Sequence, residues 1–289
     1  MTRLFFLLSI SLFIQPLMAQ DKPAYQLFNK DGKNIKYKKL LAAAEQADII
    51  FFGELHNNPI AHWLQLELAR DLHEEKREGL LLGAEMFEAD NQILIDEYFA
   101  GTIDTKAFEE EARLWNNYKT DYKPLLELAR ENGLRFIATN IPRRYANLTY
   151  RKGFEGLDSL SVEAKTYIAP LPIHFDIDLP GYKNIMEMMA GHGDENSENF
   201  PKAQAAKDAT MAHFISRNWE PGKTFLHFNG SYHSDGFEGI IWHLRQYEPG
   251  VSMLSITTVE QASLEQLEDE NNGKADFILV VDEDMTKSY

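Results

Sequence analysis

The residues best suited to chemistry follow four short apolar runs, each at the point where the run ends. They are Glu54 and His56, Glu85 and Glu88, Asn140, and Asn229 with His233. If the runs are parallel strands, their carboxyl ends meet at one edge of the sheet, where ligands bind in α/β proteins. We therefore expect Glu54, His56, Glu85 and His233 to lie around one cavity at that edge.

Two of these strand ends share a pattern in which a glycine is followed three residues later by a histidine. The segments are Gly53-Glu54-Leu55-His56 and Gly230-Ser231-Tyr232-His233. Glycine allows a sharp turn out of the strand, so that the histidine points back over the sheet edge. Two His with one or two Glu suit zinc or another divalent ion, and a remaining carboxylate is free to act as a general base.

The pattern thus predicts a metal site formed by Glu54, His56, Glu85 and His233, with Glu54 and Glu85 as the candidate catalytic carboxylates of a metal-dependent hydrolase. The alternative is structural, because a histidine after a strand is often a hydrogen-bonded residue and a glutamate there is often a helix cap. We favour the cap for Glu88.

The segment 150–200 carries residue types that ligate haem iron or cover its apolar faces. They are Tyr167, His174, Tyr182, Met186, Met188, Met189 and His192. Methionines at helical spacing are more often core residues. His192, between two glycines, is the better candidate ligand, and Tyr182 is a weaker one.

Six apolar runs are predicted as buried strands: 49–53, 80–84, 135–139, 224–228, 252–257 and 277–281. Helical patterns lie between them at 60–76, 91–99, 105–115, 122–131, 203–218 and 236–246. Alternation of this kind predicts an α/β fold with a central, mostly parallel sheet flanked by helices on both faces. Segment 150–200 interrupts the alternation, and we interpret it as a helical capping insertion at the carboxyl edge.

The first residues resemble a secretory signal peptide, with Arg3 before an apolar stretch and Ala19 before polar sequence. We expect cleavage after Ala19, a single domain over 20–289, and a periplasmic or secreted location. The chain has no cysteine, so it has no site for a lipid tether, and we expect no stable membrane anchor. A formal net charge of −16 argues against a nucleic-acid partner.

Several motifs together resemble the ChaN family of haem-binding uptake proteins, which belongs with Tiki proteases, TraB proteins and erythromycin esterases. The matching segments are 53–65 with Glu54, His56, His62 and Gln65; 85–88 with Gln92; Trp115 and Tyr118; 140–143; Phe200 with 203–204 and 208–212; and 229–235. The resemblance implies a sheet between helices, export, His62 as a pocket residue, and haem bound face to face across a homodimer. Family members are commonly lipoproteins, from which this cysteine-free chain departs.

Two functions are consistent with these observations. The favoured one is a haem-binding protein of haem and iron uptake, with haem under segment 150–200. The other is a metal-dependent hydrolase, a peptidase or esterase, that uses the Glu/His site at the strand ends. A binding protein that keeps this site as a structural network is a third possibility.

Overall fold

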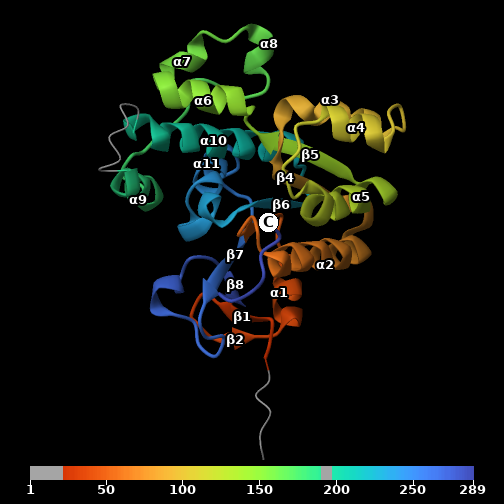
Figure 1. The fold of residues 1–289 in the computed structure, drawn as a ribbon, viewed down its shortest axis with the longest axis vertical. Helices are drawn as coiled ribbons and strands as arrows, with labels where there is room; N and C mark the ends of the chain where they lie inside the picture. The colour runs from red at the N-terminus through yellow and green to blue at the C-terminus, as the bar shows by residue number, and fades with distance from the viewer. Residues whose placement is uncertain (1–21, 190–196) are drawn as a thin grey trace, which may run out of the picture.

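The computed structural model describes residues 22–189 and 197–289. The predicted signal peptide and His192 lie outside these ranges. An eight-stranded sheet forms the centre, in the order β2-β1-β8-β7-β3-β6-β4-β5 (Figure 1). Its strands are β1 (Tyr25–Asn29), β2 (Asn34–Ile35), β3 (Ile49–Glu54), β4 (Leu80–Glu88), β5 (Arg135–Asn140), β6 (Thr224–Gly230), β7 (Met253–Gln261) and β8 (Phe277–Asp282). From β8 to β5 all neighbours are parallel, whereas β1 is antiparallel to β8 and β2. The predicted α/β fold is confirmed.

Helices surround this sheet. The α-helices are α1 (Tyr37–Ala44), α2 (Pro59–Lys76), α3 (Gln92–Phe99), α4 (Thr105–Glu111), α5 (Lys123–Glu131), α6 (Arg143–Lys152), α7 (Glu155–Asp158), α8 (Val162–Lys165), α9 (Pro180–Met189), α10 (Phe200–Asn218) and α11 (Ile240–Tyr247). A π-helical turn spans Tyr118–Tyr122, and short 3-10 turns span 77–79, 89–91, 197–199, 231–233, 235–237 and 269–271.

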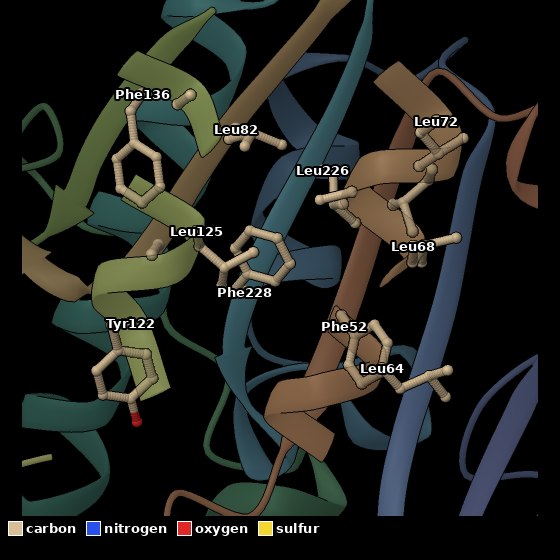
Figure 2. Packing of buried hydrophobic residues seen from close by; sticks show 14 of the residues in the cluster. Phe52, Leu64, Leu68, Leu72, Leu82, Tyr122, Leu125, Phe136, Leu226 and Phe228 are labelled. Carbon is tan, nitrogen blue, oxygen red and sulfur yellow. The ribbon is translucent and has the colours of Figure 1, made fainter. Parts of the chain in front are cut away.

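The parallel strands are apolar on both faces because each face packs against helices. Successive side chains of a strand point to opposite faces, so Phe52 packs toward α2 and α5 while Phe51 packs toward α10 and α11. Figure 2 shows the first of these cores, in which Phe52 of β3 lies beside Leu64 of α2 and Phe228 of β6 lies beside Leu125 of α5. Continuous apolar runs such as Ile49–Phe52 follow from this double cover.

The structure differs from the expected elements at several places. The antiparallel strands β1 and β2 and helix α1 were not predicted. The helix predicted to reach Trp115 ends at Glu111, because Ala112 is extended (φ −74°, ψ 143°). The helix predicted from Gly236 begins at Ile240, because Gly236 and Gly239 have positive φ values of 66° and 53°.

The described part of segment 150–200 packs against α10, and Gly181 of α9 also accepts a hydrogen bond from the hydroxyl of Tyr232, in the turn that follows β6. Leu157 and Ile168 lie in one apolar cluster with Ala206 of α10, and Tyr182 of α9 lies in another with Ala205. Figure 1 shows α6, α7 and α8 beyond α10, and α9 beside it. In the described ranges, no helix is long and apolar enough to cross a lipid bilayer.

Candidate functional site

A cavity of about 870 Å³ lies at the carboxyl ends of β3, β4, β5 and β6. Glu54, His56, Glu85 and His233, the four residues predicted from the strand ends, all line it. Helix α2 begins two residues after Asn57, which lines the cavity, and the Asn58 side chain accepts hydrogen bonds from the first amides of that helix. Two hydrogen-bonded networks, centred on Glu54 and on His233, form its floor.

Glu54 is the centre of the first network and is buried. Its Oε1 accepts hydrogen bonds from the Tyr122 hydroxyl at 2.7 Å and from His56 Nδ1 at 2.9 Å, and its Oε2 accepts one from Gln65 Nε2 at 2.8 Å. Burial alone would raise the pKa of Glu54, but hydrogen bonds from His56 and His62 hold it at about 2. Glu54 is therefore a carboxylate at any physiological pH.

His56 presents one free ring nitrogen to the cavity. When the ring is neutral and Nδ1 donates to Glu54, Nε2 carries the lone pair. The ring packs edge-on against Trp115, with centroids 4.7 Å apart. Its other neighbour is Gly230, where a Cβ atom would lie 2.9 Å from His56 Nε2 and 3.5 Å from Glu85 Oε2. His56 Nε2 and the Glu85 carboxylate thus approach the same point.

Charge sets the protonation of His56. Burial lowers the pKa of this imidazole, but the hydrogen bond to Glu54 and the charges of Glu85 and Glu54 raise it above its ordinary value.

His233 is the centre of the second network and lies between two carboxylates. Its Nε2 is 3.2 Å from Glu85 Oε1 and its Nδ1 is 2.6 Å from Asp208 Oδ1. Burial would lower the pKa of His233, yet these carboxylates raise it to about 10. The backbone N–H of Gly230 donates to Glu85 Oε2 at 2.8 Å, and the pKa of Glu85 is far below its ordinary value. The result is a buried ion cluster that holds Glu85 in one orientation.

Asp208 was not among the predicted site residues. It lies on α10 and also accepts a hydrogen bond from the Tyr182 hydroxyl at 3.0 Å. The signal was present in the sequence, since Asp208 stands among the apolar residues of the motif at 208–212, where a carboxylate needs a partner. Tyr122 was missed as well, because it contacts Glu54 through tertiary packing alone.

The family assignment rests on a comparison of the whole pattern. The family model described as haem-binding uptake, Tiki superfamily, ChaN, matches residues 40–244. The chain belongs to the ChaN family. Its match includes the segments that supply both networks of the cavity.

Solved structures agree in fold. ChaN of Campylobacter jejuni, a structure of cofacial haem binding, has a TM-score of 0.68 and 16% identity, covering 89% of this chain and 96% of that chain. A protein from Bacillus cereus has a TM-score of 0.50 and 14% identity, covering 85% and 90% of the two chains. The chloroplastic protein RETICULATA-RELATED 5 of Arabidopsis thaliana is 29% identical over 147 residues, 49% of this chain and 19% of that protein's length. The chain thus spans about a fifth of this curated relative.

The residues predicted to contact haem have different surroundings. Tyr182 is buried and its hydroxyl donates to Asp208, so an iron bond would require that hydrogen bond to break. His62 is buried behind Glu54, with Nε2 3.1 Å from the His56 carbonyl oxygen and Nδ1 3.4 Å from Glu54 Oε2. His192 lies outside the described residues. The described part of segment 150–200 supplies no lining residue to the cavity, and the capping wall expected from this segment stays a prediction.

Two further expectations concern Glu88 and a metal. Glu88 makes no side-chain capping hydrogen bond in the turn that follows it, but it interacts with the backbone N–H of Arg143 at the start of α6, so its role as a helix cap stays a prediction. Glu88 also lines the cavity. Within the described residues, no group of three or more His, Asp or Glu side chains has a geometry that holds a metal ion. Metal binding at Glu54, His56, Glu85 and His233 stays a prediction.

Proposed function

We propose that this protein is an exported haem-binding protein of haem and iron uptake, and that haem enters the 870 Å³ cavity with its iron facing His56. The observation that carries the proposal is the free Nε2 of His56 at the cavity wall, with Nδ1 held by Glu54. Metal-bound histidines donate their second ring N–H to a carboxylate or a carbonyl in just this manner. Membership of the ChaN family supports haem as the ligand.

The cavity wall suits the two parts of haem. Trp115, Leu114 and Ile141 offer apolar surface for the macrocycle. Arg143 and Lys207 line the same cavity and supply positive charge for the carboxylates at its edge. The volume falls within the range of pockets that bury most of a small ligand. The residues present therefore fit haem.

Haemin should bind saturably to the purified mature protein, with a Soret band that stops growing at about one haem per chain. We also propose that two haems pair across a two-fold interface, because pairing would bury the face that one cavity leaves open. Haemin should then convert monomer to dimer by mass action. Absorption titration and sedimentation velocity on the same samples measure both effects. A linear, unsaturable titration would contradict the proposal.

Haemin binding should weaken as the pH falls, because only the neutral imidazole of His56 can bond to iron. The pKa of His56 is raised, so the loss should be centred above the ordinary histidine value of about 6.5. The haemin affinity should reach its maximum at pH values above the pKa of His56. Haemin titrations across a pH series measure it, and Glu54→Gln should move the midpoint to lower pH by removing a carboxylate that raises it. A midpoint that does not move in Glu54→Gln would show that His56 is not the titrating ligand.

A hydrolase acting on a peptide or an ester is the second candidate, and one observation favours it. His56 Nε2 and the Glu85 carboxylate both adjoin Gly230. A water molecule between them could lose a proton to one of these groups, which would act as a general base. Glu54 would orient His56, and the charged His233 would keep Glu85 in place. A divalent ion bound by Glu54, His56, Glu85 and His233 would first have to displace the proton of His233, because only a neutral imidazole binds a metal.

A further inference from the structure

One wall of the cavity contains hydrogen-bond acceptors that have no partner. In the described part of the chain, six buried side-chain atoms lack a hydrogen-bond partner, and three of them belong to residues of this cavity: Glu88 Oε2, Asn140 Oδ1 and Gln204 Oε1. Glu88 and Asn140 are only 8% and 9% exposed. Buried acceptors without partners are costly and uncommon, so their concentration here indicates a ligand that supplies donors.

These three oxygens belong to neighbouring elements. Glu88 and Asn140 are paired in register at the ends of β4 and β5. Gln204 lies on α10, which packs along β5. The Asn140 amide is fixed, since its Nδ2 donates to the Glu85 carbonyl oxygen at 2.9 Å, which leaves Oδ1 as the free end. Glu88 Oε1 lies 3.6 Å from Arg113 Nε, which likewise leaves Oε2 free.

Positive side chains stand beside the free acceptors. Lys207 follows Gln204 by one helical turn, and Arg143 begins α6 close to Glu88, where its backbone N–H opposes the rise that burial causes in the pKa of Glu88. Both line the cavity, and within the described residues neither side chain forms an ion pair. Lys207 is near enough to Glu85 to help lower the pKa of that carboxyl. This wall therefore offers acceptors for N–H groups next to cations for an anion.

We propose that the wall formed by Glu88, Asn140, Gln204 and Lys207 binds the head group of an amino acid, in which an ammonium or amide N–H adjoins a carboxylate. Haem cannot satisfy these acceptors, because its edge carries carboxylates and hydrocarbon groups but no N–H donor. Trp115 and Ile141 would contact an apolar side chain of the same ligand. The cavity thus takes a second class of ligand, by contacts that do not depend on haem.

Three indole compounds measure how much the ammonium and the carboxylate of the head group each contribute to binding. Tryptophan carries both the ammonium and the carboxylate, tryptamine carries only the ammonium, and indole-3-propionate carries only the carboxylate. Calorimetric titration of the haem-free protein should give tryptophan a Kd at least about tenfold below that of either other probe, because each extra charge-assisted hydrogen bond adds affinity.

Matched variants test which residue binds the ammonium group of the ligand and which binds its carboxylate. Gln204→Met keeps the side-chain length and removes the acceptor, so it should weaken tryptophan and tryptamine binding and leave indole-3-propionate unchanged. Lys207→Met should weaken tryptophan and indole-3-propionate and spare tryptamine. Gln246→Met, on α11 and away from the cavity, should change none of the three.

The stability of the free protein separates a binding role from a structural one. Because Gln204 Oε1 has no partner, Gln204→Met should keep or raise the melting temperature while it weakens binding. Equal affinities for the three probes, or no heat with any of them, would mean that water or Lys207 satisfies these acceptors, and would overturn the proposal. So would a Gln204→Met variant that melts earlier yet binds tryptophan as the wild type does.

Discussion

Replacing His233 by Leu is expected to lower the free energy of unfolding by about 3–5 kcal/mol at pH 7, the usual effect of removing one partner from a buried ion cluster. The substitution leaves Glu85 and Asp208 buried without the cation between them. Tyr182 and the Gly230 amide satisfy only one oxygen on each carboxylate. Urea unfolding followed by circular dichroism measures the loss.

His213→Leu is the matched control, because His213 lies on α10 in contact with the rings of Phe214 and Tyr247 and forms no ion pair in the described structure. Its effect should stay within about 1 kcal/mol, as for other substitutions that break no buried network. A similar loss in both variants would show that His233 contributes by packing alone.

The pH dependence of stability gives an independent check on the same cluster. The pKa of His233 rises from an unfolded value of about 6.5 to about 10 in the folded chain. Protonated His233 contributes fully to the stability of the folded chain at pH values below its pKa in the unfolded chain. This contribution is lost as the pH rises through about 10, where the folded chain also loses the proton. The difference between wild type and His233→Leu should therefore shrink between pH 7 and 10.

The strand ends were predictable because they follow from short-range patterns. Continuous apolar runs identify parallel strands, and the side chains after them must meet at one edge, so Glu54, His56, Glu85 and His233 could be named from sequence. The hydrogen-bond partners that surround these four side chains could not be predicted from the sequence. The Tyr122 hydroxyl reaches Glu54 across 68 positions in the sequence, and no local pattern encodes that contact.

The loop that carries Trp115 illustrates a second limit. Its sequence continues the helical pattern of α4, but the chain leaves the helix at Ala112 and places Trp115 against His56. Tertiary packing overrides helix propensity here. Segment 150–200 shows a similar limit, because its apolar residues required burial without specifying where, and those in the described part pack on α10.

His56→Ala is expected to weaken haemin binding by more than roughly 100-fold and to shift the Soret band of the saturated complex from its wild-type position, since loss of even an outer partner of a metal-bound histidine costs 10–100-fold. The variant should fold, because Glu54 keeps its hydrogen bonds from Tyr122 and Gln65. Absorption titration measures the affinity, and circular dichroism verifies the fold.

Three comparison variants decide which residue meets the iron. His174→Ala removes an exposed histidine outside the cavity and should bind haemin as the wild type does. Tyr182→Phe or His192→Ala should change the Soret band only if that side chain is the ligand, and either change combined with an unaltered His56→Ala spectrum would contradict the assignment to His56.

The hydrolase candidate predicts a different outcome. If the wild type shows no saturable haemin spectrum, yet the protein loaded with a divalent metal cleaves a peptide or an ester and loses this activity in both His56→Ala and Glu85→Gln, then His56 acts as a base and the cavity holds a substrate instead of haem.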